Sequence, residues 1–206
     1  MNFETAIEEA VEASEDRNFD ESIDLIINFT DLDLSDPNNR INDDLKLPNQ
    51  ADESIKVAVI GDSLNGEAAD RAISESELED MFDEPNEAKK LADEFSFLIA
   101  EAPLMPKIGQ HLGQVFGPRN MMPDPTPPGS DPTETIEDLR NTVRITVKDQ
   151  PLLQVKIGKE DHDADSVSRN ASTIYNFVED NLPNGVNNVK NVLVKTTMGP
   201  SVEVDN

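Results

Sequence analysis

Two kinds of apolar pattern divide this chain, and their order along the sequence constrains the fold more than any other feature. Near both ends, apolar and polar residues alternate: Ile23, Leu25, Ile27 and Phe29 share one side of FDESIDLIINF, and NTVRITV at 141–147 repeats the pattern. Alternation is typical of a strand with one buried face. In the middle, SIKVAVIGDS and SFLIAEA are unbroken apolar runs, which are typical of parallel strands buried on both faces.

Helical patterns lie between these strands and predict a mixed α/β (α+β) class. Apolar residues recur at helical spacing in most of these segments, and Asp165 or Ser166 is expected to cap the last helix, which ends at the turn residues 183–185. We expect helices over 2–16, 66–73, 75–82, 84–95, 105–117, 133–140 and from about 166 to 182.

The return of the first pattern near Asn141 predicts a discontinuous architecture of two domains. One domain, 1–48 plus 142–206, would use both termini, and a second α/β domain, 49–141, would be inserted after Pro48. Five prolines within residues 123–132 exclude regular structure there, so 118–132 is expected to be a stiff loop close to a hinge.

Composition excludes several classes of protein. The 206 residues contain no cysteine, which excludes disulfides, zinc–thiolate sites and a thiol nucleophile. No apolar run approaches the ~20 residues of a membrane span, and MNFETAIEEA does not have the form of a secretory signal, so we expect a cytoplasmic protein without membrane contact.

The charge is strongly acidic and unevenly distributed. Asp and Glu number 43 against 17 Lys and Arg, a formal net charge of −26, and the acids are scattered along the chain rather than gathered in a tail. Scattered acids favour a protein adapted to molar salt, where the Debye length falls to ~3 Å and self-repulsion is screened. Residues 141–206 hold 9 acids and 7 bases, so an anionic partner would meet the least repulsion there.

Two motifs resemble functional sites but also have an ordinary structural interpretation. GDSLNG at 61–66 resembles the nucleophile loop of GDSL-type esterases, but Ile108 precedes His111 by three residues and Lys159 precedes His162, so the Asp-x-x-His partner is missing. DHDADS at 161–166 begins like a calcium loop, yet lacks the Gly and Glu that such a loop needs and reads as a turn with a helix cap. We therefore expect no catalytic residue, no metal and no cofactor.

Gly109, Gly113 and Gly117 recur every fourth residue within a predicted helix. This spacing differs from the glycine spacing of phosphate-binding loops. It predicts instead a helix face made smooth for close packing.

The last strip of sequence, VKTTMGPSVEV at 194–204, alternates Val194 with Lys195 and Thr197 and then reaches Gly199. A glycine at a strand end lets another backbone approach closely, but a plain strand end fits the same residues. Phe19 likewise fits a buried residue at the start of a strand, and Met198 fits a core residue.

The resemblance of four segments to a known family favours the functional interpretation of these residues. VKTTMGPSVEV, NFDESIDL, LGQVFGPRNMMP and NTVRI together resemble the archaeal form of the universal large-subunit ribosomal protein L-one family, in order and spacing over nearly the whole chain. The Thr-Met-Gly-Pro signature at 197–200 is highly specific, and the acidity resembles haloarchaeal members. The resemblance implies a split β-α-β, ferredoxin-like domain from both termini and an inserted Rossmann-like three-layer domain.

The resemblance also implies a function and its partners. Members are parts of the large ribosomal subunit in the cytoplasm, where they bind large-subunit rRNA to form a mobile stalk near the tRNA exit site and aid release of deacylated tRNA. Many also bind their own mRNA and repress its translation. A diverged α/β module that binds a ligand or a protein, without a ribosomal role, is the alternative.

Carried over by motif, the implied RNA contacts are Phe19, Ser22, Asp24, Thr197, Met198 and Gly199. Lys156, Lys195 and Arg144 are expected phosphate contacts from the least acidic third of the chain. The implied hinge residues are Pro48, Pro118, Arg119, Pro123 and Asn141.

The chain departs from the family at two places. Gly-Pro-Arg-Gly-Lys-Met-Pro is usual, whereas residues 117–123 here read Gly-Pro-Arg-Asn-Met-Met-Pro. Asn120 can adopt the left-handed conformation that a glycine would hold, but the lysine charge is lost. The family's basic, glycine-rich stretch after Leu-Pro is here Asn49-Gln50-Ala51-Asp52. Both departures lie at or near the inserted domain, so they affect the expected contacts and closure of that domain more than the RNA site of the terminal domain.

Overall fold

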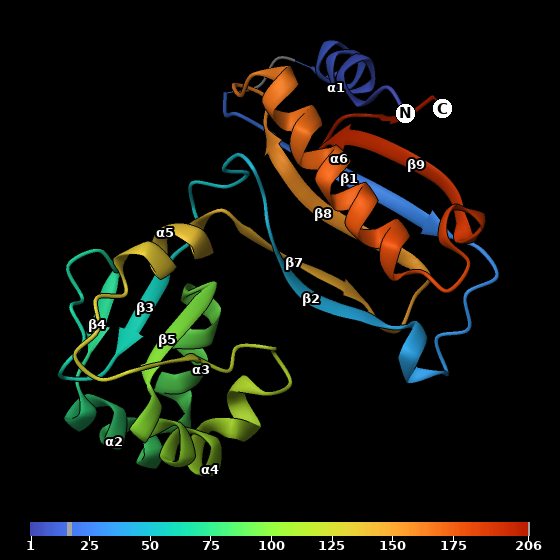
Figure 1. Ribbon diagram of the computed structural model, residues 1–206. Coiled ribbons are helices and arrows are strands. Elements are labelled where there is room, and N and C mark those ends of the chain that lie inside the picture. Colours follow the sequence, from blue (N-terminus) through green and yellow to red (C-terminus); the bar gives the residue numbers. More distant parts are fainter. Residues whose placement is uncertain (16–17, 206) are drawn as a thin grey trace. The chain divides into compact units, whose positions relative to one another are not determined.

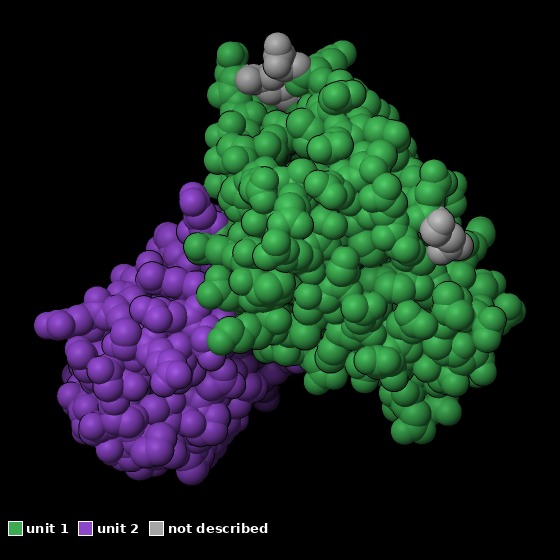
Figure 2. All heavy atoms as spheres, turned by 45° about the horizontal axis from the view of Figure 1, so that its top comes forward, with its two compact units in different colours: residues 1–52, 141–206 green, residues 53–140 purple. Residues whose placement is uncertain are grey.

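The computed structural model describes residues 1–15 and 18–205. The chain divides into two compact units, which Figure 2 colours separately: unit 1 comprises Met1–Asp52 and Asn141–Asn206, and unit 2 comprises Glu53–Arg140. Both contain helices and sheet, so the predicted mixed α/β class is confirmed. Among the described residues, no helix has the length and apolar character needed to cross a membrane.

Unit 1 is built on a four-stranded antiparallel sheet in the order β10-β9-β1-β8. Because β1 pairs antiparallel to both β8 and β9, the succession β8–α6–β9 is a split β-α-β motif with β1 between its strands. β2 and β7 form a separate antiparallel pair. The elements of unit 1 are α1 (Phe3–Glu12), β1 (Ser22–Phe29), β2 (Ile41–Lys46), β7 (Thr142–Val147), β8 (Leu152–Lys159), α6 (Ala164–Asn181), β9 (Val189–Thr196) and β10 (Ser201–Glu203), with 3-10 turns at Pro37–Asn39 and Gly185–Asn188.

One face of this sheet is covered and the other is open. Ile23, Leu25 and Ile27 are buried in a core shared with the apolar stripes of α1 and α6, as the alternation predicts. Figure 1 shows α6 lying along β8. The rings of Phe3 on α1 and Tyr175 on α6 lie 6.1 Å apart within that core. The intervening residues of β1 are only partly buried, and no helix in the described part of unit 1 packs on their side.

Asp163, rather than the predicted Asp165 or Ser166, caps α6. Its backbone is extended, and its carboxylate accepts hydrogen bonds at 3.3 Å from both the N–H and the hydroxyl of Ser166. Asp165 lies in the first helical turn and pairs with Arg169. At the other end of the chain, the predicted helix over 2–16 is observed as Phe3–Glu12, and residue 16 lies outside the described residues.

Unit 2 is built on a parallel sheet in the order β4-β3-β5-β6. Its elements are β3 (Val57–Ile60), β4 (Arg71–Ile73), α2 (Glu75–Asp83), α3 (Pro85–Glu94), β5 (Phe97–Glu101), a 3-10 turn at Ala102–Leu104, α4 (Met105–Phe116), β6 (Asp124–Thr126) and α5 (Thr133–Arg140).

Helices cover both faces of the unit 2 sheet, which explains the unbroken apolar runs. Ala58 and Ile60 pack with residues of α2, α3 and α4 on one face. Val57 and Val59 pack with Ile136 and Leu139 of α5 on the other. Every residue of β3 and β5 is therefore buried.

The helix predicted over 66–73 is wrong. Residues 67–70 form a turn, and Arg71–Ile73 is the strand β4, which pairs in parallel with β3. Asp70 holds the start of β4 against β3, because its N–H donates to the carbonyl of Val57 and its carboxylate accepts from the N–H of Val57 at 2.8 Å. Pairing with a buried strand thus overrides the local helical preference of Glu67-Ala68-Ala69.

The proline-rich segment 118–132 is also more regular than expected, because Asp124–Thr126 forms β6 at the edge of the sheet. Pro125 is tolerated there because an edge strand leaves one row of backbone groups unpaired. Asn120 has φ 59°, the left-handed conformation expected for the residue that replaces a family glycine.

The predicted close packing of the glycine face of α4 is wrong for two of its three members. A Cβ added to Gly109 or Gly113 would meet nothing within 4 Å. Gly109 is exposed and Gly113 is half-buried, so the glycine spacing marks no helix–helix contact in the described residues.

Candidate nucleic-acid interface

The start of β1 and the end of β9 lie side by side, although they are far apart in the sequence. Ile23 pairs with Thr196 and Asp24 with Lys195 in the antiparallel ladder. The pairing continues past the strands, because the N–H of Thr197 donates to the carbonyl of Ser22 at 2.9 Å. The hydroxyl of Thr197 lies 3.2 Å from the same carbonyl. The two sequence segments predicted to contact RNA thus form one continuous surface.

A tight turn over Thr196–Gly199 follows β9, and its backbone is held by specific acceptors. The N–H of Gly199 donates to Thr196, to the carbonyl at 3.2 Å and to the hydroxyl at 3.1 Å. The N–H of Met198 donates to the Glu21 carboxylate at 2.8 Å. A Cβ at position 199 would lie 2.3 Å from the Thr196 hydroxyl, so the turn requires glycine there.

Two large apolar side chains project into solvent at this end of unit 1. Phe19 is 59% exposed and Met198 is 60% exposed, so neither is a core residue and the two core readings are excluded. An exposed aromatic or thioether side chain next to polar backbone is a suitable platform for an unpaired base, because every base has a flat apolar face.

The open face of the sheet continues this surface with hydrogen-bonding side chains. Asp24 lies between Lys156 of β8 and Lys195 of β9 in the two ladders, and it accepts a hydrogen bond from the Gln154 amide at 3.1 Å. We define the β1–β9 surface as Phe19, Ser22, Asp24, Lys195 and Thr197–Gly199.

The other two predicted phosphate contacts are less available. The Lys156 ammonium lies 2.8 Å from the Asp52 carboxylate and is mostly buried, so part of its charge is already neutralised. Arg144 lies on β7, in the separate two-stranded sheet, where it pairs with Asp44 at 2.9 Å. Arg144 is therefore not part of the β1–β9 surface.

The predicted hinge residues fall into two groups. Pro48 and Asn141 lie near the points where the chain passes between the units, and the N–H of Leu47 donates to the carbonyl of Asn141 at 2.8 Å. Pro118, Arg119 and Pro123 belong to unit 2, after α4. Arg119 lies 3.4 Å from the Asp93 carboxylate of α3, which gives it a partner inside that unit.

Sequence reasoning missed three residues that shape the surface: Glu21, Thr196 and Glu160. Glu21 is 1% exposed and Thr196 is fully buried. The sequence gives no signal for Glu21, because an acid at the start of a strand is ordinarily exposed to solvent. Its partner is 177 residues away in the sequence.

Neither the esterase-like motif at 61–66 nor the calcium-loop-like motif at 161–166 forms a functional site among the described residues. Ser63 is exposed, and its N–H is bound by the Glu101 carboxylate at 2.6 Å, while His111 stacks on Phe82 with ring centroids 4.4 Å apart. The described residues contain no group of acids and histidines arranged to hold a metal ion. Asp163 of the DHDADS motif serves as the cap of α6 instead.

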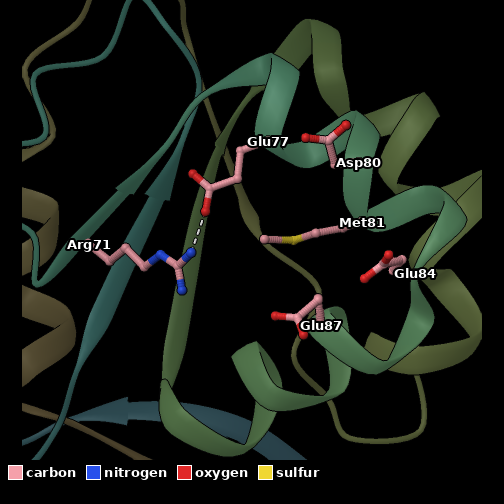
Figure 3. Close-up of a pocket in the computed structure, with 6 residues that line it drawn as sticks. All are labelled: Arg71, Glu77, Asp80, Met81, Glu84 and Glu87. Atoms are coloured by element: carbon pink, nitrogen blue, oxygen red, sulfur yellow. Dashed lines mark hydrogen bonds and ion pairs between the residues drawn. The ribbon is translucent and has the colours of Figure 1, made fainter.

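One pocket of unit 2 is lined almost entirely by acids. Glu77, Asp80, Glu84 and Glu87 surround the side chain of Met81, and Arg71 reaches in to pair with Glu77 (Figure 3). Carboxylates repel phosphate, so this pocket does not suit a nucleic acid. Among the described parts, the β1–β9 surface is the better candidate for an RNA partner.

Comparison with known proteins identifies the family. A sequence model of the "Ribosomal protein L1p/L10e family" matches residues 11–200. "Large ribosomal subunit protein uL1" of Natronomonas pharaonis is 42% identical over 207 residues, covering 98% of each chain. The proteins of the same name from Methanothermobacter thermautotrophicus and Thermococcus kodakarensis are 39% and 42% identical and cover 97% of this chain. The chain therefore belongs to the ribosomal protein L1p/L10e family.

Proposed function

We propose that this chain, a non-enzymatic protein of the large ribosomal subunit, binds large-subunit rRNA through the β1–β9 surface. The observation that carries the proposal is the bond from the Thr197 N–H to the Ser22 carbonyl, which joins the two motif segments into one exposed surface. Family membership supplies the class of partner, and the exposure of Phe19 and Met198 supplies the means of contact.

Recognition would use shape and hydrogen bonds rather than bulk attraction. Bases would stack on Phe19 and Met198, and Asp24 would accept a hydrogen bond from a guanine edge or a ribose hydroxyl. Lys195 would contact phosphate. Lys156, on the other side of Asp24, would add a weaker contact, because Asp52 already neutralises part of its charge. Such a mode suits a protein of net charge −26 in concentrated salt, where release of counterions contributes little.

Salt dependence tests this mode. With two lysines contacting phosphate, log affinity plotted against log salt should have a slope of about −2 or shallower. Filter binding to purified large-subunit rRNA from moderate to molar KCl measures it. A slope near −5 or steeper would show that non-specific attraction to phosphate dominates.

A double variant tests the location of the surface. Thr197→Val with Met198→Ala should remove detectable rRNA binding and leave the fold intact, because both side chains are exposed. The matched control is Thr146→Val with Met122→Ala, the same changes at exposed positions outside the surface. Equal affinities for the two double variants would place the site elsewhere.

We propose the finer roles on the same basis. As part of a stalk near the tRNA exit site, the protein would aid release of deacylated tRNA, so ribosomes lacking it should retain that tRNA longer. A segment of its own mRNA that resembles the rRNA site would bind the same surface, so excess protein should repress translation of that mRNA in an extract. The Thr197→Val, Met198→Ala variant should lose both effects. If it co-sediments with large subunits as well as wild type does, the β1–β9 surface is not the ribosomal contact.

A further inference from the structure

Glu21 is a buried carboxylate that holds the turn carrying Met198. It is 1% exposed, and its Oε2 accepts the Met198 N–H at 2.8 Å. Burying a carboxylate is expensive unless hydrogen bonds stabilise its charge, and bonds from backbone N–H groups to carboxylates are among the stronger ones. Glu21 is too buried to touch an RNA itself, so its effect on the surface is exerted through the turn.

A second carboxylate, Glu160, fixes the position of Glu21. Its Oε2 accepts the Glu21 N–H at 3.2 Å, and its Oε1 accepts the Ser14 hydroxyl at 3.0 Å. In return, the Glu160 N–H donates to the Glu21 carbonyl at 3.0 Å. Glu160 thereby ties the segment after α1 and the end of β8 to the start of β1.

The result is a chain of bonds from Ser14 through Glu160 and Glu21 to Met198. Glu21 is buried and Glu160 is partly buried, in a protein that is already strongly acidic and near the place where an anionic partner would bind. Both lower the electrostatic attraction for RNA. Their hydrogen bonds serve instead to fix the N–H groups of Met198 and Glu21 and the hydroxyl of Ser14, which is a positioning task.

We infer that Glu21 and Glu160 are positioning residues, which hold the Thr196–Gly199 turn in its RNA-binding conformation before RNA arrives. The inference rests on the proposed rRNA-binding function. A surface that is ordered in advance binds more tightly, because the ordering entropy is not lost on association. Electrostatics alone predicts the opposite, since removal of a negative charge near RNA should tighten binding.

The test compares Glu21→Ala with Asp20→Asn, which removes the same charge one residue away at an exposed position. Asp20→Asn should bind large-subunit rRNA as tightly as wild type or more tightly. Glu21→Ala should bind about tenfold or more weakly, the range for loss of a hydrogen bond to a charged group. Glu21→Gln keeps an acceptor for the Met198 N–H and should recover most of the affinity.

Hydrogen exchange of the free protein separates positioning from general loss of stability. In Glu21→Ala, exchange should accelerate in residues 197–199 and stay unchanged in the central part of β9, Val192–Val194. If Glu21→Ala does not fold, Ser14→Ala is the variant that tests the positioning role, because it removes one hydrogen bond to Glu160 and leaves both carboxylates in place. It should weaken RNA binding by a few fold and accelerate exchange in the same turn.

Two outcomes overturn the inference. One is a folded Glu21→Ala variant with wild-type exchange in the turn and unchanged or tighter RNA binding. The other, when only Ser14→Ala can be studied, is wild-type exchange and affinity in that variant. If wild-type protein binds no rRNA, the proposed function fails instead, and the exchange of residues 197–199 still reports whether the carboxylates order the turn.

Discussion

Units 1 and 2 bury their sheets in different ways. In unit 2, neighbouring residues of β5 such as Leu98 and Ile99 are both buried, because helices cover the two faces. In unit 1, every second residue of β1 is buried, and the residues between them lie on an open face. A sheet covered on both sides has no face left for a partner, whereas a sheet covered on one side presents a regular array of side chains.

The same difference explains where polar groups are placed. On the open face, Asp24, Gln154 and the Asn28–Asn191 pair are spaced by the strand ladders, and the amides of Asn28 and Asn191 are 2.8 Å apart. Such groups suit recognition of bases and ribose hydroxyls. In unit 2, four acids line the pocket around Met81, and their charges repel phosphate. We therefore propose unit 1, and not this pocket, as the place where an RNA partner binds.

Core substitutions give the largest expected effect, because they test directly whether one or both faces of each sheet are buried. Leu98→Ala and Ile99→Ala in unit 2, and Ile27→Ala in unit 1, should each lower the free energy of unfolding of their unit by about 2–5 kcal/mol. Ile26→Ala, on the open face, should lower it by about 1 kcal/mol or less. Native-state hydrogen exchange resolves the two units. Equal losses for Ile26→Ala and Ile27→Ala would mean that the open face is covered.

Gly199→Ala tests the turn after β9, where unit 1 carries the proposed RNA contacts. The added Cβ would lie 2.3 Å from the Thr196 hydroxyl, so the turn must move, and rRNA affinity should fall about tenfold, which is about 1.4 kcal/mol. Filter binding measures the loss. Adding Thr196→Ala removes the clash and should recover part of the affinity, whereas an unchanged affinity in Gly199→Ala would show that RNA does not depend on this turn.

Gly109→Ala is the matched glycine-to-alanine change in unit 2. It should produce a small gain in stability, whereas Gly199→Ala should produce a loss of RNA affinity. Gly109 lies within α4, where nothing would meet the new Cβ, so alanine should stabilise unit 2 by about 0.5–1 kcal/mol and leave rRNA binding unchanged. Thermal unfolding measures it. Gly61→Ala, by contrast, should destabilise the same unit, because φ is 143° and the Cβ would meet Glu101 at 2.4 Å.

Tyr175 gives the smallest expected effect, confined to alkaline pH. Burial raises the pKa of its hydroxyl, and the charge of Glu179 adds to the shift. Because the folded-state pKa is raised, the associated stability is complete below the unfolded pKa of about 10 and is lost as pH rises through the folded value. Tyr175 is the only tyrosine, so absorbance at 295 nm reports it alone, and Tyr175→Phe should abolish the alkaline loss. A titration at the ordinary pKa would mean that the α1–α6 core admits water.

Much of the fold could be predicted because local patterns report burial. The alternation of β1 named its buried residues, and the apolar runs of β3 and β5 indicated a sheet covered on both faces. The left-handed conformation of Asn120 was expected because the family has a glycine at this position and asparagine tolerates that conformation. Where burial repeats regularly along a strand or helix, the sequence of that segment alone is enough to predict which side chains are buried.

Prediction failed mainly where a distant partner decides the local structure. Residues 71–73 form a strand because β3 offers them backbone groups, and Asp163 caps α6 because the chain is extended there. The glycine spacing of α4 predicted a contact that the structure does not contain. The errors at 71–73 and in α4 concern segments whose neighbours in space cannot be read from their neighbours in sequence. The error about the cap is local, because Asp163 bonds to Ser166, three residues further on.

Periodicity and motif order are properties of short segments, and they were enough to predict the mixed α/β class, the buried face of β1 and the family. The three-dimensional structure was needed to show that Thr197 lies against Ser22, that Phe19 and Met198 are exposed, and that Glu21 holds the turn. Those features depend on hydrogen bonds between residues about 175 positions apart, and such bonds exist only after the sheet has formed.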